Sequence, residues 1–241
     1  MMTGRLGNAL RSILDIILPR LCPVCGKRLT VNEEGICFTC FRHTERTFYE
    51  NTPYDNRVAR MLWGKMNIEK AVSMFVYIPK GHISQTIYDM KYHGKKNLCT
   101  AMGKIVAAQI EGSGFFNGID LIVPVPLARK RRKQRGYNQS ELFANGISRI
   151  TGIPVCTKAV ERVSFSISQT QLTHNERTRN VEKVFRMKNP DMIKGRHVLL
   201  VDDVFTTGST VTSCGNEMAK AQGVKISVLT LSTVILHGIS D

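Results

Sequence analysis

The sequence feature that most constrains the fold is Val198–Thr210, where an apolar run ends in two aspartates followed by a glycine turn. A continuous apolar run of this kind is typical of a strand that is covered on both faces, as in parallel sheets. After the turn, apolar residues recur at helical spacing, at Val211, Cys214, Met218 and Ala221. The stretch therefore predicts a buried strand, a turn and an amphipathic helix, in that order, within an α/β fold.

The polar half of this stretch predicts a binding site for a ribose phosphate. A helix N-terminus offers backbone N–H groups to a phosphate, and Gly208 allows the chain to turn tightly there. Asp202 and Asp203 can accept hydrogen bonds from the two vicinal hydroxyls of a ribose. The phosphate would also contact the hydroxyl groups of Thr206, Thr207, Ser209 and Thr210. The alternative is an ordinary N-cap beside acids that are solvated or bind a metal, but the agreement of strand, acid pair and turn favours ribose 5-phosphate.

The chain from about residue 70 onward alternates between β-rich and helical segments, which is typical of βαβ units. Strands are expected at 72–78, 119–123, 198–201 and 224–231, and helices at 83–92, 98–110, 143–150 and from 211. The polar residues 157–190 lack periodicity, so we expect a mobile excursion with little regular structure. Ligands bind at the carboxyl ends of parallel strands, and we expect the segments after 123 and after 201 to meet there.

A strongly basic segment follows the strand expected at 119–123, and we expect it to form a loop. Six of its seven positions from 129 to 135 are cationic, namely Arg129, Lys130, Arg131, Arg132, Lys133 and Arg135. Such a loop suits a pyrophosphate group, since guanidinium groups bind its oxygens in pairs. A nucleic-acid backbone would explain the charge equally well, and a solvated charge run is the third possibility. The formal net charge of +15 predicts attraction to polyanions without choosing among them.

Four of the seven cysteines form two C-x2-C pairs separated by eleven residues: Cys22, Cys25, Cys37 and Cys40. Gly26 and Gly35 stand where knuckle turns would need them, and four thiolates suit a structural Zn²⁺ with no open position. Two disulfides or free thiols are the alternatives. The other cysteines make no disulfide framework, which indicates a reducing, cytoplasmic compartment. Residues 20–45 are also too short to bury a core without a metal.

The first 19 residues are expected to form an amphipathic helix, because apolar side chains recur at helical spacing from Leu6 to Leu18. Asp15 interrupts the apolar run, so the segment is neither a signal peptide nor a membrane span. Packing on the body of the protein is favoured over peripheral docking at the inner face of a membrane. The predicted organisation is this helix (1–19), a four-cysteine module (20–45) and an α/β domain (46–241).

Several further motifs fit one known family. The basic segment lies between Val-Pro-Val-Pro at 123–126 and Arg-Gly-Tyr-Asn-Gln at 135–139. Tyr-Asp-Met-Lys-Tyr-His-Gly-Lys stands at 88–95, and Gln-Thr-Gln-Leu and Glu-Arg-Thr-Arg-Asn-Val follow later. With the cysteine module and Val198–Thr210, which is similar to the phosphoribosyl pyrophosphate signature of type I phosphoribosyltransferases, nearly the whole chain resembles the ComF family of competence-associated proteins.

The resemblance implies a type I phosphoribosyltransferase fold, with a mostly parallel twisted sheet flanked by helices and a small zinc-ribbon-like module. It also implies that Asp202 and Asp203 hold the ribose hydroxyls of phosphoribosyl pyrophosphate, that Thr206–Thr210 holds its 5′-phosphate, and that Mg²⁺ bridges diol and pyrophosphate. A flexible loop would close over the substrate. We expect its residues to be Gln169, Gln171, Arg177, Arg179 and Asn180, with Arg177 in a catalytic role.

Two functions follow from these expectations. The first is phosphoribosyl transfer to an acceptor that no residue in 46–118 identifies. The second is a non-catalytic competence factor that binds single-stranded DNA and uses the transferase site as a ligand sensor, with DNA-uptake proteins as partners. Tyr77, Tyr92 and Tyr137 could stack bases beside the basic segment, although packing is the commoner use of tyrosine.

Overall fold

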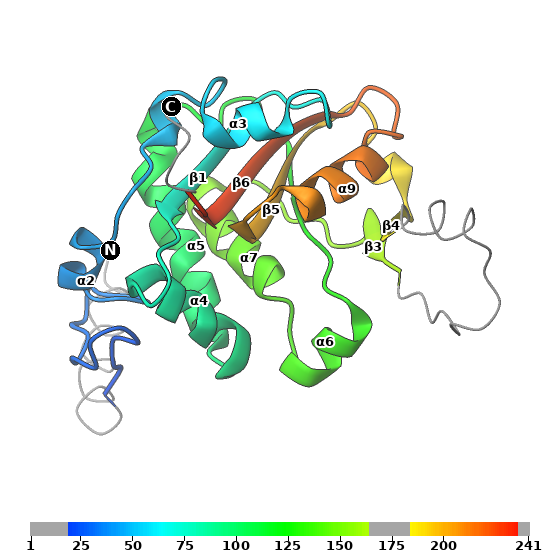
Figure 1. The fold of residues 1–241 in the computed structure, drawn as a ribbon. Coiled ribbons are helices and arrows are strands. Elements are labelled where there is room, and N and C mark those ends of the chain that lie inside the picture. Colours follow the sequence, from blue (N-terminus) through cyan, green and yellow to red (C-terminus); the bar gives the residue numbers. More distant parts are fainter. Residues whose placement is uncertain (1–18, 164–183, 236–241) are drawn as a thin grey trace, which may run out of the picture.

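Four parallel strands form the central sheet of the computed structural model, which describes residues 19–163 and 184–235 (Figure 1). Their order is β1-β6-β5-β2, so the two strands that lie latest in the sequence occupy the centre. The bounds are β1 Ala71–Val76, β2 Leu121–Pro124, β5 His197–Phe205 and β6 Lys225–Thr233. The register places Asp202 beside Thr230 and Phe205 beside Thr233. The predicted α/β fold with a parallel sheet is confirmed.

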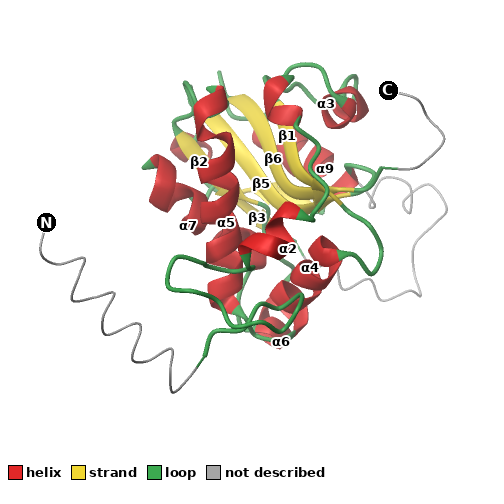
Figure 2. Cartoon of the chain, turned by 90° about the vertical axis from the view of Figure 1, so that its left-hand side faces the viewer, coloured by secondary structure: helices red, strands yellow, loops and turns green. Residues whose placement is uncertain are grey.

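Helices cover both faces of the sheet (Figure 2). One face packs against α4 (His82–Tyr92), α5 (Lys96–Ile110) and α7 (Gln139–Thr151). The other packs against α3 (Arg57–Leu62) and α9 (Ser209–Met218). Successive residues of β5 alternate between the two cores because side chains of a strand point to opposite faces: Leu199 and Val201 belong to the first, and Val198 and Leu200 to the second.

Helices α5 and α7 approach each other closely through two glycines. A Cβ atom on Gly103 would lie 2.1 Å from the carbonyl oxygen of Phe143, and one on Gly146 would lie 2.1 Å from that of Thr100. The two backbones are therefore in direct contact, and any side chain at either position would separate the helices. This contact fixes α7, whose first turn borders the functional site described below.

The four-cysteine module packs against the α4 and α5 side of the molecule. Its helix α2 (Phe38–Arg42) brings Phe41 edge-on to Phe75 of β1, with ring centroids 5.9 Å apart. Glu34 forms a 2.7 Å ion pair with Lys104 of α5. His82, the first residue of α4, places its Nδ1 3.3 Å from the carbonyl oxygen of Cys40. The module thus shares a hydrophobic core with the sheet, and its predicted boundary at residue 45 stays a prediction.

One expectation about secondary structure is wrong. The basic segment is a helix, α6 (Arg129–Arg135), rather than a loop. Arginine, lysine and glutamine all favour helices, and Gly136 ends this one at φ +77°. The polar segment 157–190 was expected to have little regular structure, and its ends form two short antiparallel strands, β3 (Val160–Arg162) and β4 (Phe185–Met187). Residues 164–183 of this segment lie outside the described ranges. Short 3-10 turns complete the fold, at Tyr49–Asn51, Glu111–Ser113 and Pro190–Met192.

Some expectations concern residues outside the described ranges. They are the helix at 1–19, apart from its last residue, and the loop residues Gln169, Gln171, Arg177, Arg179 and Asn180. Within the described ranges, no helix has both the length and the apolar character needed to cross a membrane.

Candidate functional site

A cavity of about 460 Å³ lies where β5 ends and α4, α6 and α7 come together. Of the predicted site residues, the structure brings six to its lining: Asp202, Asp203, Thr206, Thr210, Arg131 and Arg135. These residues come from two segments that are far apart in the sequence, and they meet because β2 and β5 are neighbouring parallel strands. The other predicted residues of the turn and of α6 lie outside this lining: Thr207, Gly208, Ser209, Arg129, Lys130, Arg132 and Lys133.

The two aspartates lie inside β5 rather than after it, because the strand continues to Phe205. Asp202 accepts a 2.9 Å hydrogen bond from Ser140 Oγ, on the first turn of α7, and another of 2.9 Å from the backbone N–H of Asp203. The Oδ2 atom of Asp203 lies 3.0 Å from Nζ of Lys91 on α4. Both carboxylates are buried, so each depends on these partners for compensation of its lost hydration.

Burial and the neighbouring charge of Asp203 raise the pKa of Asp202 to about 7. The hydrogen bonds from the Asp203 backbone and from Ser140, together with the charge of Lys91, act in the opposite direction. A buried carboxyl beside a second negative charge is harder to ionise than one in water. The protonated form of Asp202 is therefore favoured up to a higher pH than for an ordinary aspartate.

Gly208 shapes the turn between β5 and α9. Its φ of +78° lies in the left-handed region, and a Cβ there would stand 2.7 Å from the Phe205 ring. Thr207 Oγ1 lies 3.2 Å from the hydroxyl of Ser209 and accepts the Ser209 N–H at 3.4 Å. Thr206, Thr207 and Ser209 are exposed, so their hydroxyls are accessible to a ligand. The turn joins the acids directly to the N-terminus of a ten-residue helix.

Helix α6 divides its cations between the cavity and solvent. Arg131 and Arg135 line the cavity, and none of the residues of α6 is buried. Arg135 donates a 2.7 Å hydrogen bond to Gln139 Oε1, and its guanidinium lies 5.3 Å from the centre of the Tyr92 ring. The remaining cations of α6 face solvent, which separates a cavity-lining pair from an outer set.

The residues that line the cavity and were missed by the sequence reasoning include Tyr88, Lys91, Ser140 and Arg162. Tyr88 and Lys91 stand in the motif at 88–95, which carried no chemical assignment of its own. Ser140 directly follows the Arg-Gly-Tyr-Asn-Gln motif. Arg162 belongs to β3, within the segment expected to be irregular. Tyr88, Lys91 and Ser140 lie in or directly after these motifs, so the motifs could have pointed to them. Arg162 lies in no such motif and reaches the site only through the fold.

The three tyrosines named for base stacking differ in accessibility. Tyr77 lines the cavity. Tyr92 is 62% exposed and packs against Tyr88, with ring centroids 4.9 Å apart. The expectation is wrong for Tyr137, which is buried and donates a 2.7 Å hydrogen bond from its hydroxyl to the carbonyl oxygen of Met90. A base could reach the Tyr88–Tyr92 pair without any rearrangement of the core.

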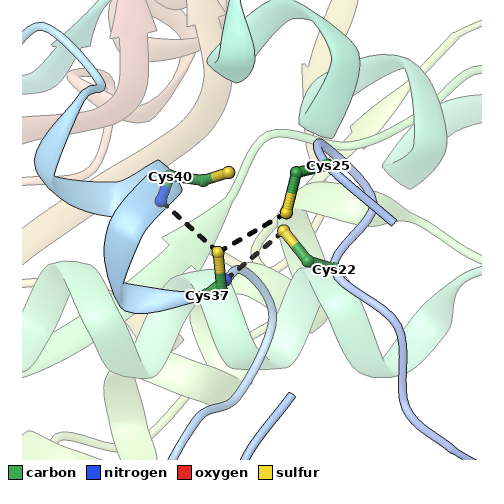
Figure 3. A group of neighbouring side chains, drawn as sticks. All are labelled: Cys22, Cys25, Cys37 and Cys40. Carbon is green, nitrogen blue, oxygen red and sulfur yellow. Dashed lines mark hydrogen bonds between the residues drawn. The ribbon is translucent and has the colours of Figure 1, made fainter. Parts of the chain in front are cut away.

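The four cysteines of the module form a second candidate site (Figure 3). Their sulfur atoms all lie within 4.8 Å of one another, and Cys25 Sγ is 3.7 Å from Cys37 Sγ. None of the four is in a disulfide. Gly26 and Gly35 adopt φ values of +70° and +78°, as knuckle turns require. Four sulfur atoms at these separations fit the tetrahedral coordination of a zinc ion, so the cluster could hold a metal.

Hydrogen bonds inside the cluster lower the pKa of the Cys22 thiol. Burial opposes the charged form of Cys22, but backbone N–H groups of Cys37, Cys25 and Val24 outweigh it and lower the pKa of Cys22 to about 7. Burial raises the pKa of Cys37 and of Cys40, and the neighbouring thiols add to this rise at Cys40. A cation would remove this penalty, because thiolates are the form that binds a metal.

The chain is similar to one protein-family domain and, over most of its length, to several known bacterial proteins. The phosphoribosyl transferase domain matches residues 99–234. The DNA utilization protein YhgH of Escherichia coli strain K12 is 28% identical over 223 residues, which cover 88% of this chain and 96% of that protein. Competence protein F of Haemophilus influenzae is 27% identical over 209 residues, which cover 83% and 89%. Competence protein ComFC of Bacillus subtilis is 25% identical over 222 residues, which cover 89% and 79%.

Proposed function

Since this chain belongs to the phosphoribosyl transferase domain family, we propose that it binds phosphoribosyl pyrophosphate together with Mg²⁺ in the cavity at the end of β5. The observation that carries the proposal is the continuous path from two buried carboxylates through the Gly208 turn to the N-terminus of α9. Asp202 and Asp203 would accept the ribose hydroxyls, and Thr206–Thr210 would bind the 5′-phosphate. The pyrophosphate would then face Arg131 and Arg135.

The chemistry that this arrangement supports is displacement at C1 of the ribose. A nucleophile would form a bond to C1 while the bond between C1 and the pyrophosphate oxygen breaks, and the electron pair would leave with the pyrophosphate. Carboxylate oxygens are ligands that Mg²⁺ prefers, and this ion would stabilise the charge of the leaving group. The chain would contribute positioning and charge stabilisation, with Arg177 and its neighbours as the proposed closing loop.

A calorimetric titration with phosphoribosyl pyrophosphate and Mg²⁺ tests the binding proposal. The double variant Asp202→Asn, Asp203→Asn should lose detectable binding, because an amide offers one acceptor oxygen where a carboxylate offers two charged ones. Asp191→Asn is the matched control, since Asp191 is an exposed acid outside the cavity lining and should leave binding unchanged. A double variant that binds as tightly as the parent protein would show that the site is wrongly assigned.

The second candidate function is binding of single-stranded DNA in natural transformation. It is supported by the outer cations of α6, which exceed what one pyrophosphate can use, and by the names of the relatives in DNA utilization and competence. The exposed Tyr88–Tyr92 pair adds a surface on which bases could stack.

We further propose that the cysteine cluster holds one structural Zn²⁺, which elemental analysis of the purified protein would detect.

A further inference from the structure

Lys91 contributes a charge to the site from outside the segment that matches the family domain. It is the last residue but one of α4, whereas the domain match begins at residue 99. Its side chain is 22% exposed, and that of its partner Asp203 is 7% exposed. Lys91 lines the same cavity as Arg131 and Arg135, so one end of α4 supplies a cation to the acid pair and to the proposed pyrophosphate region alike.

The contact with Lys91 compensates a buried charge in the ligand-free protein. Asp203 Oδ2 is fully buried and makes no directed hydrogen bond within the described residues, so the ammonium group 3.0 Å away is the partner that offsets its lost hydration. A buried carboxylate without a counter-charge would be strongly unfavourable. The free protein therefore needs Lys91 at Asp203.

The same carboxylate is the group to which the proposed function assigns a ribose hydroxyl. A bound diol donates hydrogen bonds to the acid pair, and the pyrophosphate of the same ligand brings several negative oxygens into the cavity. Lysine carries a compact charge on a flexible stem with rotatable donors, so its ammonium group can change partners without movement of the backbone. The pyrophosphate then competes with Asp203 for the Lys91 cation.

We propose that Lys91 is an exchangeable counter-ion, paired with Asp203 in the ligand-free protein and with a pyrophosphate oxygen when phosphoribosyl pyrophosphate is bound. This inference rests on the proposed function and adds a substrate-binding residue to it. The rival view is that Lys91 is a fixed partner of Asp203 that only maintains the shape of the site. The two views differ in how binding depends on the pyrophosphate group of the ligand.

The test compares two ligands, ribose 5-phosphate and phosphoribosyl pyrophosphate, by calorimetry with Mg²⁺ in the parent protein and in Lys91→Gln. We expect Lys91→Gln to weaken phosphoribosyl pyrophosphate binding roughly tenfold, as for loss of one charge-assisted hydrogen bond. The affinity for ribose 5-phosphate should be unchanged or higher. This ligand has no pyrophosphate group to lose a contact, and in the variant its hydroxyl no longer competes with the Lys91 ammonium for Asp203. Lys91→Arg should restore the phosphoribosyl pyrophosphate affinity.

Lys96→Gln is the matched control, because it removes the same charge from the start of α5, where Nζ lies 5.8 Å from the centre of the Tyr137 ring rather than at an acid. It should change neither affinity. Equal losses for both ligands in Lys91→Gln, or no loss for either, would overturn the exchange while leaving the proposed function in place. A parent protein that binds neither ligand would instead overturn the proposed function, and the exchange with it.

Discussion

Gly208 shows how one residue decides the geometry of the turn between β5 and α9. The sequence predicted a tight glycine turn here because a Thr/Gly/Ser run follows a strand, and in the structure Gly208 has a left-handed φ of 78°. What the sequence could not predict is that Phe205, three residues earlier, packs its ring against the glycine. Backbone conformation is encoded locally, whereas the neighbour that fills the space beside it depends on how the strand and helix meet.

Replacement of Gly208 by alanine should therefore cost more than the same change at a glycine that has room. Gly208→Ala adds left-handed strain, about 1 to 3 kcal/mol, and a clash with Phe205. Gly152→Ala is the control, since Gly152 has φ +73° and no atom within 4 Å of the place that an alanine Cβ would take. Thermal unfolding should show the larger loss for Gly208→Ala. Equal losses would mean that the ring moves aside freely.

Asp202 should make the protein less stable as the pH rises. Its pKa is raised from 3.8 to about 7, so folding favours the protonated acid, and this contribution is present below pH 4 and lost as pH passes 7. Asp202→Asn should then raise the melting temperature at pH 8 relative to the parent protein, with a smaller difference at pH 5, while ligand binding falls. A variant that is destabilised equally at both pH values would contradict the raised pKa.

At the scale of elements, helix α6 separates the cations of one basic segment into two sets, those that line the cavity and those that do not. The density of charge correctly predicted a basic surface. The expectation of a loop did not take into account that arginine, lysine and glutamine favour helices. Because α6 is helical, Arg131 and Arg135 lie on its cavity side, four residues apart. An irregular loop has no such periodicity, so the sequence reasoning could not distinguish inner from outer cations.

This separation predicts different effects for the two sets. The triple variant Arg129→Gln, Lys130→Gln, Lys133→Gln should flatten the salt dependence of single-stranded DNA binding by about 0.7 for each lost phosphate contact. Phosphoribosyl pyrophosphate affinity should remain near that of the parent protein. Arg131→Gln should instead weaken phosphoribosyl pyrophosphate binding and leave the salt dependence of DNA binding nearly unchanged. Should the triple variant leave the salt slope unchanged, the DNA surface must lie elsewhere on the molecule.

At the scale of the whole molecule, the contacts between residues far apart in the chain could not be predicted from the sequence. The parallel sheet, the order of its helices and the acid pair follow from periodicity and local motifs. Ser140 and Lys91 reach the acids only because α7 and α4 cover the same face of the sheet. Neither residue carries a local pattern that specifies a partner on β5.

Removal of the proposed metal should destabilise the whole molecule rather than the module alone. The cysteine cluster belongs to the core that contains α4, α5 and β1, so loss of the ion exposes residues on all of them. Calorimetry of chelator-treated protein should show one transition at a lower temperature than the zinc-saturated protein in the same buffer. A separate low-temperature transition, with the main one unchanged, would show that the module melts independently.

The packing of the cysteine module against α4 and α5 also has a consequence for biosynthesis. The four thiols precede both helices in the chain, so a ribosome releases them before the segments that bury them have been made. In the folded protein Cys22, Cys37 and Cys40 are buried and Cys25 alone is exposed. Newly made chains, rather than mature ones, are therefore the form in which we expect oxidants and competing metals to reach the cluster.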